Sequence, residues 1–163
     1  MITHPRSRRP WRRLIATAAA ALAASAGSLA VTASPALAFA GAARSFKVTT
    51  VGFDTRFLRH QDSLARTDVI TASSSTAAKQ DGTFTVRTGL AESSCYSFES
   101  VNYPGKYLRH SSFRLRIDAG DGTTTFQQDA TFCAQSALNG GSGNVSLESY
   151  NYPGYRVAGQ TPS

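Results

Sequence analysis

An internal repeat of about fifty residues constrains this chain's fold more than any other feature. Three segments return in the same order, at offsets of 48 to 50 residues: Arg56–His60 as Lys106–His110, Gln80–Phe84 as Gln128–Phe132, and Ser100–Gly105 as Ser149–Gly154. Chance explains such an ordered set poorly, so each copy should be one structural unit that packs against its neighbours. We predict repeats over about 45–94, 97–144 and 145–163, the last of them incomplete.

Short strands are the predicted content of each repeat. Residues 46–49 and 113–117 alternate apolar with polar side chains, which is the period of a half-buried strand. Tyr103–Gly105 and Asp121-Gly122 carry turn residues, because proline fixes φ and glycine tolerates positive φ. No helical stripe is evident after the N-terminal segment. The predicted fold class is therefore all-β, and three copies of four strands favour a β-trefoil with pseudo-threefold repeats.

The first 38 residues have the pattern of a secretory signal peptide. Five arginines between Arg6 and Arg13 precede an uncharged segment, 14–33, and a small-x-small site at 36–38. A membrane anchor is the alternative, but alanine dominates the segment and is only weakly apolar. We predict cleavage after Ala38, a short linker over 39–44 and a secreted, extracellular protein, with no membrane attachment after cleavage. The adjacent Arg8 and Arg9 leave the export route open.

The charge balance argues against nucleic-acid binding. The chain has a formal charge of +7, but five of its 17 basic residues lie in the N-terminal cluster. From residue 39 onward, 12 basic residues face 10 acidic ones, which leaves a net charge of only +2. The basic stripe that marks a nucleic-acid interface is therefore missing.

Two cysteines, Cys95 and Cys133, follow the predicted leader. An oxidising destination favours a disulfide between them. Two buried free thiols and a metal site are the alternatives. A metal site is the weaker one, because only His60 and His110 lie in this part of the chain and there is no close Cys pair.

Several of the repeated motifs resemble those of a known family. The segments Ser97–Gly105, Tyr107–His110 and Asp129–Cys133 are similar to the arabinose-binding domain of α-L-arabinofuranosidase B (AbfB domain), also classed as carbohydrate-binding module family 42. The resemblance runs from about Ser45 to Gly154. It implies a β-trefoil that binds L-arabinofuranose side chains of arabinan and arabinoxylan, and thereby serves the breakdown of hemicellulose. It also implies the Cys95–Cys133 pairing and no cofactor.

The resemblance implies particular binding residues. The family's pockets use the histidine of a Leu-Arg-His motif and the aspartate of an Asp-Ala-Thr-Phe motif, which are His110 and Asp129 here. Tyr103, Tyr107 and Asn102 are the predicted companions, because a furanose needs hydrogen-bonding groups and an aromatic wall. His60 and Asp81 are weaker candidates, since the family's first repeat usually holds no ligand. For both aspartates, capping a turn through backbone amides is the structural alternative.

The third repeat departs from the family pattern. After Gly154 the chain reads YRVAGQTPS, without the expected Leu-Arg-His and Asp-x-Thr-Phe motifs. The third pocket is therefore expected to be absent. An incomplete third repeat leaves strand edges unpaired in an open barrel, which favours pairing between chains. A non-functional fragment of a longer arabinofuranosidase is therefore one alternative.

Two other functions compete with sugar binding. The first is an arabinofuranosidase activity of the chain itself, which would need two opposed carboxylates. In the family, a separate catalytic domain usually stands beside this one. Besides its aspartates, the chain has only Glu92, Glu99 and Glu148. A trefoil that inhibits a protein partner is possible in principle, because fold does not fix function. We predict a non-catalytic binding module with no catalytic residues and no metal.

Overall fold

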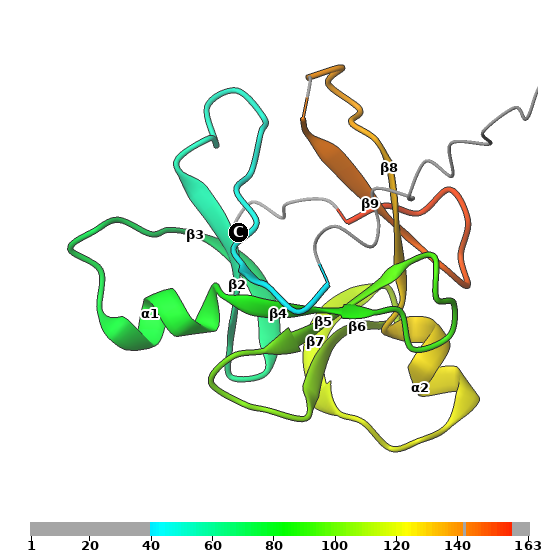
Figure 1. Ribbon diagram of the computed structural model, residues 1–163. Coiled ribbons are helices and arrows are strands. Elements are labelled where there is room, and N and C mark those ends of the chain that lie inside the picture. The colour runs from blue at the N-terminus through cyan, green and yellow to red at the C-terminus, as the bar shows by residue number, and fades with distance from the viewer. Residues whose placement is uncertain (1–39, 142, 158–163) are drawn as a thin grey trace, which may run out of the picture. The chain divides into compact units, whose positions relative to one another are not determined.

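The computed structural model describes residues 40–141 and 143–157 (Figure 1). The predicted signal peptide lies outside this part of the chain, as do residues 158–163. The described strands are β1 (Ala43–Arg44), β2 (Arg56–Gln61), β3 (Leu64–Val69), β4 (Phe84–Thr88), β5 (Tyr96–Ser100), β6 (Lys106–Ser111), β7 (Arg114–Ala119), β8 (Phe132–Ser136) and β9 (Val145–Ser149).

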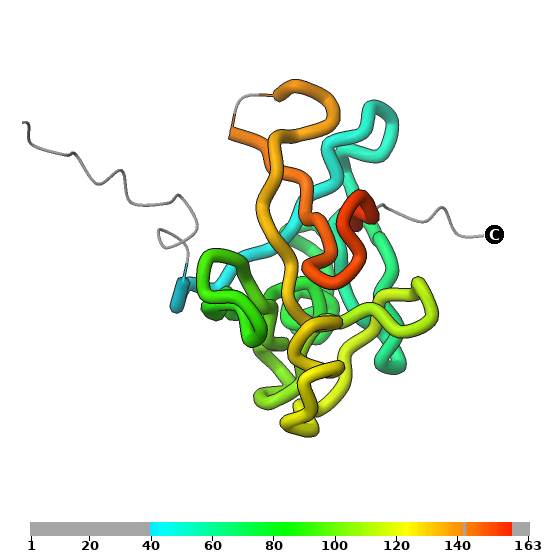
Figure 2. Tube along the Cα trace, turned by 90° about the vertical axis from the view of Figure 1, so that its right-hand side faces the viewer, coloured from blue at the N-terminus to red at the C-terminus, as the bar shows by residue number. Residues whose placement is uncertain are grey.

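These strands form one antiparallel sheet in the order β1-β4-β5-β6-β7-β3-β2, with β8 pairing to both β5 and β9. The first two repeats each contain a long hairpin, β2–β3 and β6–β7. The two hairpins meet where Leu64 pairs with Arg116. In both views, β8 runs from α2 (Thr124–Asp129) at the bottom towards the β8–β9 loop at the top (Figure 1, Figure 2). The predicted all-β class is confirmed.

Equivalent backbone pairings show that the three repeats are built alike. In each repeat the opening segment pairs with the start of the following strand: Lys47 with Phe57, Glu99 with Tyr107, and Glu148 with Arg156. The third repeat therefore follows the same path as far as the described residues extend. In the first repeat, the predicted strand over 46–49 contributes only the single bridge at Lys47.

The two hairpin turns have the same strained backbone. Asp62 and Ser63 have φ of 52° and 64°, and Ser112 and Phe113 have φ of 51° and 61°. Two successive positive φ values are typical of the tight turn that matches the twist of hairpin strands. Phe113 thus lies in the turn, and the strand that we predicted to begin there begins at Arg114.

Two short helices were not predicted. Helices α1 (Thr76–Asp81) and α2 occupy equivalent places in the first two repeats. Ser75 and Thr123 begin them as N-caps, their hydroxyl oxygens accepting from the amides of Ala78 and Phe126. Each helix has six residues, so it is too short to show a helical stripe in the sequence.

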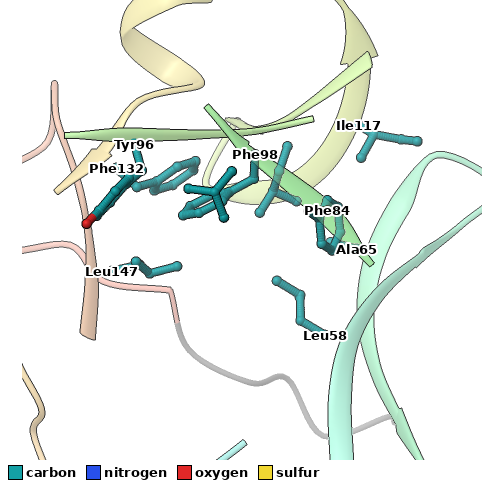
Figure 3. Close-up of a cluster of buried hydrophobic side chains, with 10 residues drawn as sticks. Leu58, Ala65, Phe84, Tyr96, Phe98, Ile117, Phe132 and Leu147 are labelled. Carbon is teal, nitrogen blue, oxygen red and sulfur yellow. The ribbon is translucent and has the colours of Figure 1, made fainter. Parts of the chain in front are cut away.

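The core gathers one or two side chains from most strands. Phe84, Phe98, Leu108, Ile117 and Phe132 are each at most 2% exposed, and several of them are labelled in Figure 3. Burying a large apolar side chain contributes about 1.5–3 kcal/mol. All five belong to one hydrophobic cluster, so the repeats share one core. No helix in the described part of the chain is long and apolar enough to span a membrane.

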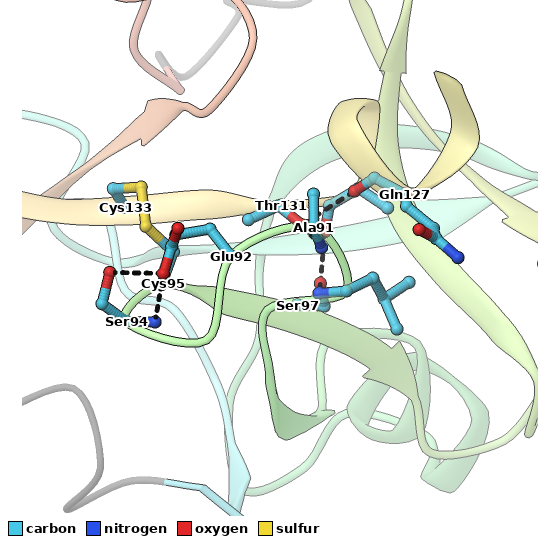
Figure 4. Close-up of a disulfide and its surroundings, with 10 residues drawn as sticks. Ala91, Glu92, Ser94, Cys95, Ser97, Gln127, Thr131 and Cys133 are labelled. Carbon is cyan, nitrogen blue, oxygen red and sulfur yellow. Dashed lines mark hydrogen bonds between the residues drawn. A yellow bond between two sulfur atoms is a disulfide. The ribbon is translucent and has the colours of Figure 1, made fainter. Parts of the chain in front are cut away.

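A disulfide joins Cys95, directly before β5, to Cys133 in β8 (Figure 4). Polar contacts surround it: the amide of Ala91 donates to the Thr131 hydroxyl, which in turn donates to the carbonyl of Gln127. The predicted disulfide is confirmed, and free thiols and a metal site at these cysteines are excluded.

Candidate functional site

Two polar clusters of the same composition lie at equivalent places in the structure. Each combines an arginine and a histidine from a hairpin strand, the last residue of a short helix, and a serine and an asparagine from the next repeat. Cluster 1 consists of Arg59, His60, Asp81, Ser100 and Asn102. Cluster 2 consists of Arg109, His110, Asp129, Ser149 and Asn151. Each cluster therefore spans two repeats.

In cluster 1 every polar group has a partner close at hand. Asp81 accepts from Arg59 Nη2 at 2.8 Å and from Asn102 Nδ2 at 2.7 Å. His60 Nε2 lies 3.0 Å from Ser100 Oγ and 3.1 Å from Asn102 Oδ1, while its Nδ1 faces Asp81 Oδ1 at 3.7 Å. Both ring nitrogens of His60 are thus directed at protein groups.

Cluster 2 has the same framework, but its histidine makes different contacts. Asp129 accepts from Arg109 Nη2 with one oxygen and from Asn151 Nδ2, at 2.7 Å, with the other. His110 uses Nε2 for both of its contacts, 2.8 Å to Asn151 Oδ1 and 3.4 Å to Asp129 Oδ1. Its Nδ1 has no hydrogen-bond partner among the described residues. Cluster 2 therefore keeps one imidazole nitrogen available for a ligand.

Exposure separates the two clusters further. The His60 side chain is 3% exposed and the His110 side chain 13%. His110 lines a cavity of about 280 Å³, together with Ser149 and Tyr152, and no residue of cluster 1 lines it. Tyr152 stands edge-on to the His110 ring, with ring centroids 5.2 Å apart. Cluster 2 therefore opens onto this cavity, in which Tyr152 forms an aromatic wall.

Burial lowers the pKa of His60 below its usual value of 6.5, although the carboxylate of Asp81 acts in the opposite direction. The folded protein therefore holds this imidazole neutral at a pH where the unfolded chain has begun to bind a proton. Stability contributed by neutral His60 is fully present above pH 6.5 and is lost as the pH falls through its lowered folded value.

We expect the free energy of unfolding to decrease as the pH is lowered from about 6.5 towards 5, before most carboxylates titrate. Urea unfolding at several pH values measures this slope. His60→Gln keeps a hydrogen-bonding side chain without a titrating group, so its slope should be smaller than that of the wild type. An identical slope in both proteins would contradict a buried neutral His60.

The structure brings together only some of the predicted site residues. His110 and Asp129 are adjacent, as predicted, but Asn102 and Tyr103 lie with His60 rather than with them. Tyr107 packs edge-on against Phe126 of α2, at 6.4 Å between ring centroids. The companions of His110 are instead Asn151 and Tyr152. The signal for them was in the sequence, because Asn151-Tyr152 repeats Asn102-Tyr103 after 49 residues.

The turn-capping alternative for the two aspartates does not match their contacts. Asp81 and Asp129 are the last residues of their helices, and their carboxylates contact arginine, asparagine and histidine side chains. Each carboxylate holds an asparagine and an arginine in place around the histidine. Both aspartates therefore organise a polar cluster.

The described residues thus form an all-β domain built from repeats, with a polar cluster between successive repeats. The chain belongs to the alpha-L-arabinofuranosidase B (ABFB) domain family, which matches residues 46–158. This confirms the family expected from the sequence motifs.

Known relatives are longer than this chain. It is 51% identical over 112 residues to a probable alpha-L-arabinofuranosidase B of Aspergillus fumigatus and 50% identical over 113 residues to alpha-L-arabinofuranosidase B of Emericella nidulans. These alignments cover 69% and 67% of the chain but only 22% of each relative. A solved arabinofuranosidase complexed with arabinofuranosyl-alpha-1,2-xylobiose is 46% identical, with a TM-score of 0.72 over 74% of this chain and 25% of that one. The chain thus spans about a fifth to a quarter of these proteins.

Proposed function

We propose that the chain is a non-catalytic carbohydrate-binding module that recognises L-arabinofuranosyl side chains of arabinan and arabinoxylan, and that cluster 2 is its binding site. One observation carries the proposal. His110 lines a cavity walled by Tyr152, and its Nδ1 has no hydrogen-bond partner among the described residues, while Asp129 and Asn151 hold the ring in place. The family's occurrence in arabinofuranosidases supports the choice of sugar.

Each group in cluster 2 has a definite role in this proposal. The open Nδ1 of His110 exchanges a hydrogen bond with a sugar hydroxyl, and Tyr152 covers the apolar face of the furanose ring. Asp129 does not line the cavity itself. Its carboxylate accepts from Arg109 and Asn151, and it thereby positions the asparagine that holds the imidazole ring.

The first test compares two tyrosines at equivalent places in the two clusters. Tyr152 and Tyr103 are 44% and 49% exposed, and each stands edge-on to its histidine, at 5.2 Å and 5.5 Å. Tyr152→Ala should weaken binding of methyl α-L-arabinofuranoside about tenfold, because it removes the aromatic wall. Tyr103→Ala should leave binding unchanged. Titration followed by amide NMR measures both affinities.

Matched exposure makes the pair informative, since neither substitution opens the core. Equal losses in the two variants would show that both clusters bind, and a loss in Tyr103→Ala alone would assign the site to cluster 1. Either result contradicts the assignment to cluster 2.

The proposal is for binding without turnover. Glycoside hydrolysis by the usual route needs two carboxylates across the bond, and no Asp or Glu lines the described cavity. Glu99 and Glu148 are engaged elsewhere, by Arg87 and Gly105 and by Arg156 respectively. We expect no release of 4-nitrophenol from 4-nitrophenyl α-L-arabinofuranoside. Release that is abolished by changing one carboxylate would overturn this part of the proposal.

We further propose an extracellular location, which the signal-like pattern of residues 1–38 and the Cys95–Cys133 disulfide support. A culture that secretes the protein should release a chain beginning at Phe39. N-terminal sequencing of the secreted chain tests this location. Retention of the full-length protein in the cells would contradict it.

Pairing between chains is the last part of the proposal. The same cavity is also lined by the core residues Leu58, Leu115, Phe132 and Val157, so apolar surface continues from the core to the outside. A second chain that covered this surface would compete with the sugar for the cavity. Sedimentation velocity over a hundredfold range of protein concentration tests the pairing between chains. A monomer at all concentrations would contradict it.

A further inference from the structure

Beside cluster 2 lie two exposed aromatic side chains that the binding of a single furanose does not use. Phe113 is 68% exposed and Tyr155 60% exposed. Their ring centroids are 5.5 Å apart, and Phe113 lies 5.6 Å from Tyr152, the wall of the proposed furanose pocket. Both line the same cavity as His110. We call Phe113 and Tyr155 the outer aromatic pair.

Cluster 1 has no such pair, although its framework is the same. Ser63 occupies the turn position of Phe113, with nearly the same φ of 64° against 61°. Lys106 stands where Tyr155 does, directly after the repeated Tyr-Pro-Gly, and its ammonium lies 5.2 Å from the Tyr103 ring centroid. The outer aromatic pair therefore belongs specifically to the cluster that opens onto the cavity.

Phe113 is a costly residue at its position. A bulky side chain at positive φ is uncommon, and serine at the equivalent place in the first repeat shows that the turn does not require it. A benzyl group that is 68% exposed also gains little from burial. A strained, exposed aromatic residue next to a pocket points to contact with a ligand.

We infer that the outer aromatic pair is a second sugar subsite, which takes the pyranose ring that carries the arabinofuranosyl branch. The inference rests on the proposed function of cluster 2 and extends it from one sugar to the linkage that bears it. A pyranose chair has an apolar face of C–H groups that packs on aromatic rings, and the tyrosine hydroxyl can bond its polar rim. The pair adjoins Tyr152, so the two rings of a branched saccharide would lie on one continuous aromatic surface.

The chain itself supplies the test variants. Phe113→Ser and Tyr155→Lys, alone and combined, give cluster 2 the residues of cluster 1, and serine fits the turn without new strain. The two probes are methyl α-L-arabinofuranoside and arabinofuranosyl-α-1,2-xylobiose. The wild type should bind the trisaccharide about tenfold more tightly than the monosaccharide. The double variant should lose that preference and keep its affinity for the monosaccharide within about twofold.

Thermal unfolding of each variant verifies that the fold is retained, and the single variants show which ring contributes more. Equal affinity of the wild type for both probes, or a trisaccharide preference that survives in the double variant, would overturn the inference. Loss of self-association in the double variant without any change in sugar preference would assign the pair to a protein contact and also overturn it. If neither probe binds the wild type, the proposed function fails and this inference fails with it. Binding of the monosaccharide without a preference refutes the inference alone.

Discussion

Reduction of the Cys95–Cys133 disulfide will lower the free energy of unfolding by about 4 kcal/mol. The bond closes a loop with a sequence separation of 38, which contains the whole β6–β7 hairpin and α2. Closing such a loop restricts the unfolded chain far more than the folded one, in which β5 and β8 are already paired at Tyr96 and Phe132. A domain of this size has only about 5–15 kcal/mol of net stability, so the loss is a large fraction of it.

Urea unfolding with and without dithiothreitol measures this effect, and the midpoint should fall by about 2 M. The matched control is the double variant Cys95→Ala/Cys133→Ala, which should unfold like the reduced wild type and should not respond to the reductant. A midpoint that reduction leaves unchanged would show that strand pairing alone fixes this part of the fold.

The repeat made most of the fold accessible from the sequence. Short strands and turns follow from local patterns that occur more than once, such as the shared Leu-Arg-His and Tyr-Pro-Gly segments. The helices α1 and α2 escaped prediction because a six-residue helix is fixed by its cap and its contacts rather than by a hydrophobic period. The predicted start of β7 was wrong by one residue. Phe113 fits the alternating strand pattern, but its positive φ places it in the turn.

The candidate site was harder to predict for a topological reason. The sequence motifs suggested that a pocket is assembled within one repeat, so Asn102 and Tyr103 were grouped with His110. In the structure a repeat's opening strand is followed by a loop that reaches back to the preceding repeat, and Asn151 accordingly contacts His110. Sequence offsets establish which residues are equivalent to one another. They do not establish which equivalent residues meet, because that depends on how the strands close over the core.

Asp129→Ala should have the largest effect on binding, about a hundredfold loss of affinity for methyl α-L-arabinofuranoside. The carboxylate is the single group that contacts Arg109, Asn151 and His110. Its removal releases both the arginine and the asparagine that hold the imidazole of the binding site in place. The substitution should also cost about 2 kcal/mol of stability, which is less than for a fully buried pair because Arg109 stays 18% exposed.

Asp81→Ala separates the two effects. Asp81 makes the equivalent contacts with Arg59 and Asn102, so its removal should cost a similar free energy of unfolding. It should leave sugar affinity within about twofold of the wild type, because no residue of cluster 1 lines the cavity beside His110. Calorimetric titration at a temperature where both variants are folded measures the affinities, and urea unfolding measures the stabilities. If the Asp129→Ala and Asp81→Ala substitutions lower sugar affinity equally, the sugar does not distinguish the two clusters. The open Nδ1 of His110 would then not determine where the sugar binds.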